Sequence, residues 1–283
     1  IKSDVNGPDN SDVVAGDALA WSTGDYSSSD ATARANNEAK YGGKAGNDWI
    51  DVEEGSNKVA GDALAMSDHD EANAYTDNKA THGGKAGNDT IHGGDDGDTI
   101  SGGSLALARD EAYAETKNYA NGEHSGAGND HIYGYYGHDK IAGDALAISE
   151  REDAEAKAKN EAYNGAVAGS DYIDADEGSY SDWLAGDAMA WASGIGDTAT
   201  AHTTNKADGW GSDAGNDTIY ASSGGDLIAG GSLAVGDFGD AVTDNTATNG
   251  GEAGEDDIYG GGGSDTISGD SGSIVVEGGT AKA

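Results

Sequence analysis

Aspartates recur at one position inside glycine-rich segments of this sequence. They end the string Ala-Gly-Asn-Asp, or a close variant of it, at Asp48, Asp89, Asp130, Asp171, Asp217 and Asp256. Aspartate supplies hard carboxylate oxygens, and glycine lets backbone carbonyls turn toward a ligand because it has no Cβ. Ca²⁺ takes about six to eight oxygens of these kinds. We therefore predict that these residues, the first-turn aspartates, bind calcium.

A second set of aspartates follows the first after nine residues, or after eleven in the fourth copy. These second-turn aspartates are Asp12, Asp98, Asp139, Asp182, Asp226 and Asp265, and Asn57 takes the equivalent position in one copy. The glycines before them are less regular, as in DVEEGSN before Lys58 and ADEGSYSD before Trp183. We count this set as candidate calcium ligands, with plain β-turns closed by hydrogen bonds as the alternative.

Both sets belong to a repeat with a period near 41 residues. After each second turn, AGDALA or GGSLA aligns one apolar column: Leu19, Leu64, Leu105, Leu146, Met189, Leu233 and Ile274. A second apolar column lies two residues further along: Trp21, Met66, Leu107, Ile148, Trp191, Val235 and Val276. Spacing of two predicts a β-strand with one buried face.

The remainder of each repeat reads Ala-x-(Ala/Thr)-x-Asn-x-Ala, as at 74–80 and 156–162. It aligns an asparagine column: Asn37, Asn78, Asn118, Asn160, Asn205 and Asn245. Stacked asparagines can hydrogen-bond along a parallel stack, which favours a second strand here with its small residues facing inward. Strings such as AEAKAKNEA are rich in helix formers, so an amphipathic helix is the alternative.

The segment from Gly84 to Ser101, GKAGNDTIHGGDDGDTIS, resembles the repeats-in-toxin (RTX) family, whose nonapeptide is Gly-Gly-x-Gly-x-Asp-x-U-x. The resemblance implies that each turn lends backbone carbonyls and its aspartate to a Ca²⁺ held between turns of adjacent coils. We predict an all-β chain in which residues 1–283 form a single domain. This domain would be a right-handed parallel β-solenoid of about seven coils.

Stacking also brings aspartates of adjacent coils close together, and bound calcium would offset their electrostatic repulsion. Aspartates one strand spacing apart, about 4.8 Å, repel each other by about 3.5 kcal/mol per pair at an effective dielectric of about 20. A further aspartate column opens the Leu-containing strand at Asp17, Asp62, Asp144, Asp187 and Asp270. Because Gly103 and Gly231 interrupt it, we predict a bend-forming role for these residues rather than a third metal column.

Composition limits the partners. The chain has 53 acidic and 15 basic residues, a formal charge of −38, which excludes nucleic acid and anionic membrane as natural partners. No apolar run is long enough to span a membrane. The seven histidines form no column, and no Ser-His-Asp or paired-carboxylate group stands apart from the repeat. We therefore expect no enzyme.

The function expected is structural, with Ca²⁺ as cofactor, in a secreted protein outside the cell or at its surface. We predict a subunit of a filament or surface layer, or an extender segment of a large adhesin; the resemblance implies export by type I secretion. Val5 aligns with Ile50, and residues 280–283 align with the start of the Asn-containing strand, which favours head-to-tail self-association. One alternative is the calcium-folding C-terminal repeat region of a secreted enzyme or toxin. Another is an ice- or glycan-binding solenoid.

For a glycan, the best candidates are the outward tyrosines Tyr75, Tyr119, Tyr133, Tyr135 and Tyr136. Ice binding is disfavoured because the outward positions of the Asn-containing strand are charged and variable, as at Arg34, Glu115 and Lys157.

Overall fold

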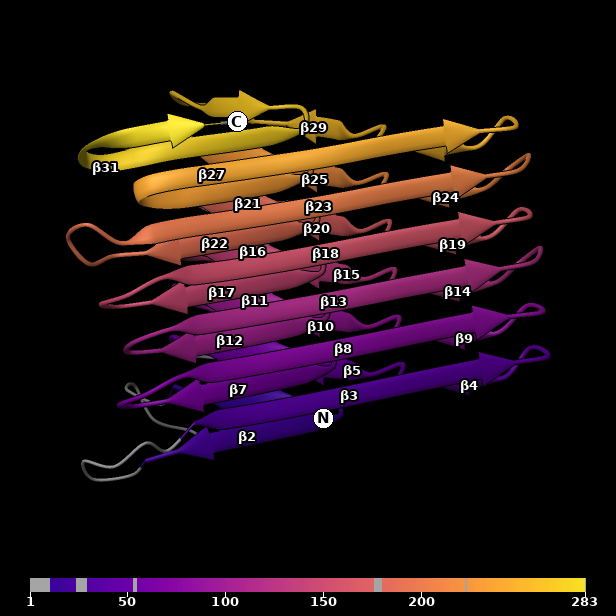
Figure 1. Cartoon of the computed structure of the whole chain (residues 1–283), viewed down its shortest axis with the longest axis horizontal. Helices are drawn as coiled ribbons and strands as arrows, with labels where there is room; N and C mark the ends of the chain where they lie inside the picture. Colours follow the sequence, from indigo (N-terminus) through magenta and orange to yellow (C-terminus); the bar gives the residue numbers. More distant parts are fainter. Residues whose placement is uncertain (1–10, 24–29, 53–54, 176–179, 222, 283) are drawn as a thin grey trace.

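The computed structural model describes residues 11–23, 30–52, 55–175, 180–221 and 223–282. All regular secondary structure in these ranges is β-strand, and every pairing is parallel. Figure 1 shows the coils stacked in sequence order, from indigo at the N-terminal end to yellow at the C-terminal end. The predicted all-β parallel solenoid is confirmed, and the helix alternative for the Asn-containing segment is wrong.

Each coil contributes one strand to each of several stacks, which form four sheets. The strands that follow the first turns form a six-stranded sheet: β5 (Trp49–Asp51), β10 (Thr90–His92), β15 (His131–Tyr133), β20 (Tyr172–Asp174), β25 (Thr218–Tyr220) and β29 (Asp257–Tyr259). The strands that follow the second turns form a seven-stranded sheet: β1 (Val13–Ala15), β6 (Lys58–Ala60), β11 (Thr99–Ser101), β16 (Lys140–Ala142), β21 (Trp183–Ala185), β26 (Leu227–Ala229) and β30 (Thr266–Ser268).

The third sheet has twelve strands and combines two stacks. The Leu-containing strands are β2 (Ala18–Ser22), β7 (Ala63–Ser67), β12 (Ser104–Ala108), β17 (Ala145–Ser149) and β22 (Ala188–Ala192). The long Asn-containing strands are β3 (Ala31–Lys40), β8 (Ala72–Thr81), β13 (Ala112–Asn121), β18 (Ala154–Tyr163) and β23 (Thr198–Asp208). In each of the last two coils a single strand runs through both stacks. These strands are β27 (Ser232–Thr248) and β31 (Ser271–Lys282).

A fourth sheet of two-residue strands carries the chain from the long strands into the first turns. These strands are β4 (Lys44–Ala45), β9 (Lys85–Ala86), β14 (Gly126–Ala127), β19 (Val167–Ala168), β24 (Asp213–Ala214) and β28 (Glu252–Ala253). None of the described segments is a helix of the length and apolarity that crossing a membrane requires.

The long strands form because small and variable residues alternate along them. In β8 the alternate residues from Ala72 to Ala80 are buried, while most of those between them are exposed or half-buried. The register pairs like with like, so that Asn78 is opposite Asn37 on one side and Asn118 on the other. The predicted asparagine column is therefore confirmed.

Two predictions about the Leu-containing strands are wrong. In β7 both faces are buried, since Ala63 and Ala65 pack in the alanine layer against the long strands while Leu64 lies in the opposite cluster. Only Met66 is partly exposed. The register also places Ile274 opposite Val235, in the second apolar column, because Leu233 pairs with Gly272. The expected alignment at the C-terminal end was thus shifted by two residues.

One type of apolar side chain predominates in two layers of the core. Isoleucines such as Ile91, Ile100 and Ile132 pack between the two sheets of short strands. Alanines are the apolar side chains of the layer between the Leu-containing and long strands, where buried Ser104, Thr76 and Thr116 also lie. Because alanine is small, these two stacks can lie close together, and the polar columns occupy the middle of the coil.

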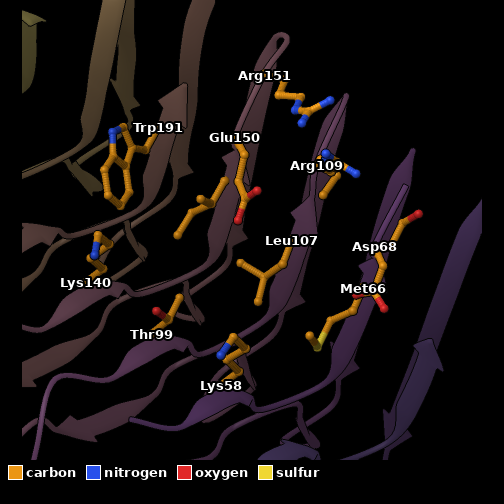
Figure 2. Close-up of a pocket in the computed structure, with 13 residues that line it drawn as sticks. Lys58, Met66, Asp68, Thr99, Leu107, Arg109, Lys140, Glu150, Arg151 and Trp191 are labelled. Atoms are coloured by element: carbon orange, nitrogen blue, oxygen red, sulfur yellow. The ribbon is translucent and has the colours of Figure 1, made fainter. Parts of the chain in front are cut away.

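A groove of about 600 Å³ follows the outer side of the Leu-containing strands (Figure 2). Half-buried Met66, Leu107 and Ile148 give it an apolar surface. Its basic residues are Lys58, Lys140, Arg109 and Arg151. The groove thus contains four basic residues beside the acidic Asp68 and Glu150.

Several positions used in the predictions lie outside the described residues. They are Val5, residues 53–54 and 176–179 of two second turns, and Ala283. Thr280, which is described, pairs with Phe238 near the start of the long strand, as the sequence predicted.

Candidate metal centre

The first-turn aspartates form one continuous column inside the solenoid. Each follows a two-residue strand, as Asp89 follows β9, and the tight turn before it needs glycine. Gly87 has a φ of 55°, and a Cβ there would overlap the side-chain amide of Asn78. Asp89, Asp130, Asp171 and Asp217 are at most 3 % exposed. The turn thus buries these four aspartates, whereas Asp48 and Asp256 in the end coils are half-buried.

One oxygen of each first-turn carboxylate is used by the fold. The backbone N–H of Asp48 donates to Oδ1 of Asp89 at 2.7 Å, and the N–H of Asp89 donates to Oδ1 of Asp130 at the same distance. The pattern continues through Asp171 and Asp217 to Asp256, at 2.7 to 3.0 Å. Each aspartate is therefore aligned by the coil that precedes it.

The other oxygen has no hydrogen-bond partner. Among the described residues, the buried Oδ2 atoms without one include those of Asp48, Asp89, Asp130, Asp171 and Asp217. A buried carboxylate oxygen without a donor is costly, since water that would solvate it has been removed. A cation in contact with Oδ2 would remove that cost.

The second-turn aspartates repeat this geometry on the other edge of the coil. The N–H groups of Asn57 and Asp98 donate to Oδ1 of the next aspartate at 2.6 and 2.8 Å. The column continues to Asp182, Asp226 and Asp265, and Asn57 takes its place in it by accepting from the N–H of Asp12. Oδ2 of Asp98, Asp139 and Asp226 again lacks a partner.

Glycine at the start of the second turn brings a carbonyl to the unpartnered oxygen. A Cβ on Gly93 would lie 2.6 Å from Oδ2 of Asp98 and 3.0 Å from the carbonyl oxygen of Gly134 in the next coil. The carboxylate oxygen of Asp98 and the carbonyl oxygen of Gly134 thus face the same space. An alanine would fill that space, which explains the glycine here.

Burial makes these carboxyl groups poor acids. Desolvation raises the pKa of Asp98 to about 9 and the pKa values of Asp139 and Asp256 to about 7. For Asp130 and Asp171, desolvation and then neighbouring aspartates raise the pKa well above its usual value. At neutral pH these groups therefore require a proton or a cation.

The aspartates that open the Leu-containing strands, the bend aspartates, were predicted only to form bends. Asp62, Asp144 and Asp187 are fully buried beside the first-turn column. Their oxygens accept from the asparagine column: Asn160 Nδ2 lies 2.9 Å from Oδ2 of Asp144 and 2.7 Å from Oδ1 of Asp187. The asparagines also contact each other at 3.0 to 3.1 Å.

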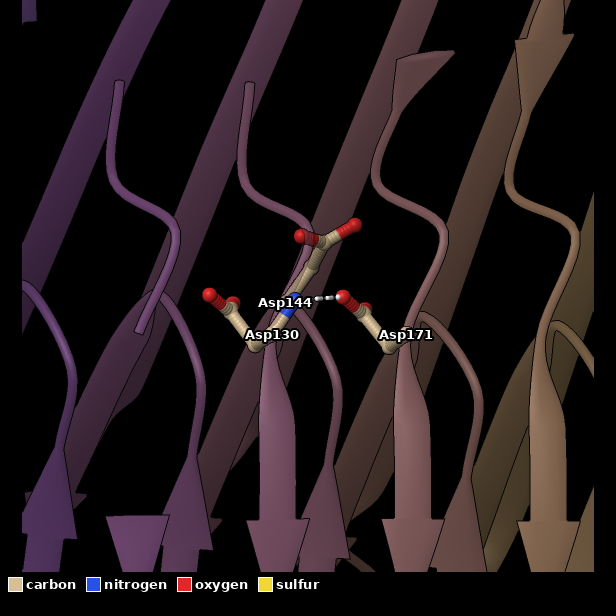
Figure 3. A group of neighbouring side chains, drawn as sticks. All are labelled: Asp130, Asp144 and Asp171. Carbon is tan, nitrogen blue, oxygen red and sulfur yellow. Dashed lines mark hydrogen bonds between the residues drawn. The ribbon is translucent and has the colours of Figure 1, made fainter. Parts of the chain in front are cut away.

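Sequence reasoning missed that these columns meet. The available signal was that both the bend aspartates and the asparagines are polar residues repeated at inward positions. Figure 3 shows the closest group, in which one oxygen from each of Asp130, Asp144 and Asp171 lies within 4.8 Å of the others. No described lysine or arginine is buried, so no basic side chain is available to neutralise these carboxylates inside the coil.

Comparison with known families decides what the columns are. The sequence profile of the RTX calcium-binding nonapeptide repeat, which spans four copies, matches residues 43–63, 84–104, 124–145, 212–232 and 251–273. The chain carries RTX calcium-binding repeats. Each matched segment runs from a first turn through the second turn to the bend, and most of each long strand lies outside the match. No match was found among curated proteins or among solved structures.

RTX nonapeptide repeats bind calcium ions, and the residues present fit that ion. The unpartnered Oδ2 atoms and the glycine carbonyls are all hard oxygen donors, the type that Ca²⁺ prefers. The first-turn and second-turn aspartates are the residues that would hold it. Bound Ca²⁺ would supply positive charge between stacked carboxylates.

We expect the calcium-free protein to be more stable at pH 5 than at pH 7.5. Folding raises the pKa of these aspartates, so the folded state binds more protons than the unfolded state. That stabilisation is present at low pH and is lost as the pH rises through about 7 for Asp139, Asp144 and Asp256, and about 9 for Asp98. Thermal unfolding followed by circular dichroism in calcium-depleted buffer measures it, as a transition that is present at pH 5 and is lowered or lost at pH 7.5. A melting temperature that rises from pH 5 to pH 7.5 would contradict the assignment.

Replacing Asp130 by Ala should weaken calcium binding more than replacing Asp139 by Ala. Asp130 lies beside two further carboxylates, whereas Asp139 has the basic residues His138 and Lys140 nearby. Calorimetric titration of the two variants with Ca²⁺ gives the comparison, with wild type as the reference. Equal affinity and cooperativity in the two variants would show that the first turn has no special role.

Proposed function

We propose that this chain is a calcium-stabilised structural rod without enzymatic activity, either a subunit of a filament or surface layer or an extender segment of a large adhesin. The observation that carries the proposal is the continuity of the aspartate columns. Oδ1 contacts link coil to coil from Asp48 to Asp256. Chemistry that repeats in every coil suits a scaffold, whereas catalysis needs one site that differs from the rest.

A location outside the cell agrees with this role. RTX repeat proteins are typically secreted, and extracellular calcium modules commonly have millimolar affinities. A rod whose sites fill only outside the cell would stay unfolded during export and fold afterwards. The same logic applies to the calcium-folding repeat region of a secreted enzyme or toxin, which is the alternative for the wider protein.

Removal of calcium should unfold the chain reversibly at pH 7.5. At this pH the folded chain without calcium must either hold protons on its buried carboxylates or leave them charged without a counter-ion, and the free energy of ion binding contributes to the free energy of folding. The measurement is the loss of the β-type far-UV circular dichroism on adding EGTA and its return with excess Ca²⁺, with Mg²⁺ as the control ion. An unchanged spectrum in EGTA would exclude a calcium-dependent fold.

Electron microscopy of the refolded protein separates filaments, which support the subunit role, from single rods, which support the extender role.

Binding of an anionic glycan is a second candidate function, favoured by the groove of Figure 2. Four basic residues line it around an apolar surface, against two acidic ones; the basic residues are Lys58, Lys140, Arg109 and Arg151, and the acidic ones are Asp68 and Glu150. The outward tyrosines are less suited, because the Tyr133 ring is stacked at 4.8 Å on His92, and Tyr119 contacts Tyr163 at 5.6 Å. Their ring faces are thus shared with neighbouring coils.

We expect a uronic-acid polysaccharide such as hyaluronan to bind, with affinity that falls as salt is added. The double substitution Lys58→Glu and Lys140→Glu should abolish binding, since it reverses charge on one side of the groove. Lys117→Glu combined with Lys159→Glu, on the exposed faces of β13 and β18, is the matched control. Titration calorimetry reports both. Equal binding by the double variant and the wild type would assign the binding to another surface.

A further inference from the structure

The first turns and the bends repeat, in two separated pieces, the geometry of the continuous second turn. In the second turn, six consecutive residues from Gly93 to Asp98 place the first glycine against the aspartate Oδ2 and against the glycine carbonyl of the next coil. This is the turn part of one RTX nonapeptide, in which the first glycine and the aspartate are five positions apart.

The same contacts occur between each bend glycine and a first-turn aspartate much further along the chain. A Cβ on Gly102 would overlap Oδ2 of Asp130 and the carbonyl oxygen of Gly143. The next coil repeats this, with Gly143 against Asp171 and Gly186. The other bend glycines that behave in this way are Gly16, Gly61, Gly186 and Gly230.

The chain therefore leaves a turn after its first two residues, runs out along a Leu-containing strand and back along a long strand, and then completes the turn. We call this arrangement the split turn. In one coil its two parts are residues 102–103 and 127–130, and β12 and β13 lie between them. Each segment matched by the sequence profile contains the second part of one split turn, the second turn, and the first part of the next split turn. It is continuous in sequence because these two parts flank the second turn.

The second position of the split turn departs from the nonapeptide. The pattern has glycine there, and Gly103 and Gly231 keep it, but the bend aspartates occupy it in the other coils. Asp144 brings an oxygen within 4.8 Å of oxygens of Asp130 and Asp171. Oδ2 of Asp130 and Oδ2 of Asp171 are buried and have no partner.

We propose that the split turns with a bend aspartate, as at Asp130, Asp144 and Asp171, are calcium sites in which the first-turn aspartates and a bend glycine carbonyl are joined by this further carboxylate, which the nonapeptide does not contain. This inference rests on the proposed calcium-stabilised fold. Asn118 and Asn160 donate to the two oxygens of Asp144, at 2.6 and 2.9 Å, and fix its orientation. A carboxylate oxygen has lone pairs for an amide donor and for a cation at the same time.

Two classes of site follow from this assignment. Sites with Asp62, Asp144 or Asp187 carry one more negative charge than those at Gly103 and Gly231, and ligand charge is a main determinant of calcium affinity. The ion also joins the two ends of the excursion through the long strands. The strongest sites would then be those that hold the twelve-stranded sheet to the rest of the coil.

The test counts calcium ions bound to the whole chain. Equilibrium dialysis against buffered Ca²⁺, with the bound metal measured by mass spectrometry, compares wild type with Asp144→Asn and Asp187→Asn. Asp77→Asn is the matched control, because Asp77 is exposed on the outer face of β8 and its loss removes the same charge. Each bend variant should lose a tightly bound ion or bind it about tenfold or more weakly, while the control should match wild type.

The outcomes separate this inference from the proposed function. Wild type that binds no calcium would overturn both. Wild type that binds calcium, with bend variants that bind the same number of ions equally well, would overturn the inference alone. If the bend variants do not fold, a crystal structure of wild type grown in Ca²⁺ decides the matter. Ions coordinated by Asp144 would support the split site, and ions that do not contact any bend aspartate would overturn it.

Discussion

Parallel stacking places identical residues of successive coils next to each other. A charged residue that recurs at one buried position of the repeat therefore forms a column of charge. A strand spacing of about 4.8 Å brings each buried aspartate next to its copies in the coils before and after. Such a column repels itself unless protons or cations lie between its members. The stability of the fold is therefore a balance of two effects of the regular repeat. Burial of apolar side chains stabilises the folded state, and repulsion within the aspartate columns destabilises it.

The rest of the coil is arranged around these columns. Asparagine recurs at an inward position of every described long strand, and its amide donates to the bend aspartates, as Asn37 does to Asp17 and Asp62. Alanine fills the adjoining layer, and isoleucine fills the layer between the sheets of short strands. In each of these two layers one kind of apolar side chain predominates, so that successive coils pack in a similar way.

Local patterns predicted much of this architecture because equivalent positions of the repeat pair with each other in adjacent coils, so that the spacing of the repeat gives the strand register. The alternation around Asn78 predicted a strand with small residues facing inward, and the nearly regular spacing of first-turn and second-turn aspartates predicted two columns. The errors arose where contacts depend on the path of the chain. Asp130 and Gly102 are far apart in sequence, so their contact could not be seen before the excursion between them was placed. Ile274 was misaligned because Gly272 takes the position that leucine holds in earlier coils.

The parallel register also determines how such a rod would respond to tension along its axis. Force applied between successive coils loads the backbone hydrogen bonds one coil at a time, as in opening a zip, rather than shearing a whole sheet at once. A coil of the dominant period adds only one strand spacing to the height of the stack. When pulled free, its chain would extend to roughly 140 Å. A calcium ion that joins two coils would act as a catch that must release before the next coil unravels, giving a material that lengthens in steps and dissipates energy at each one.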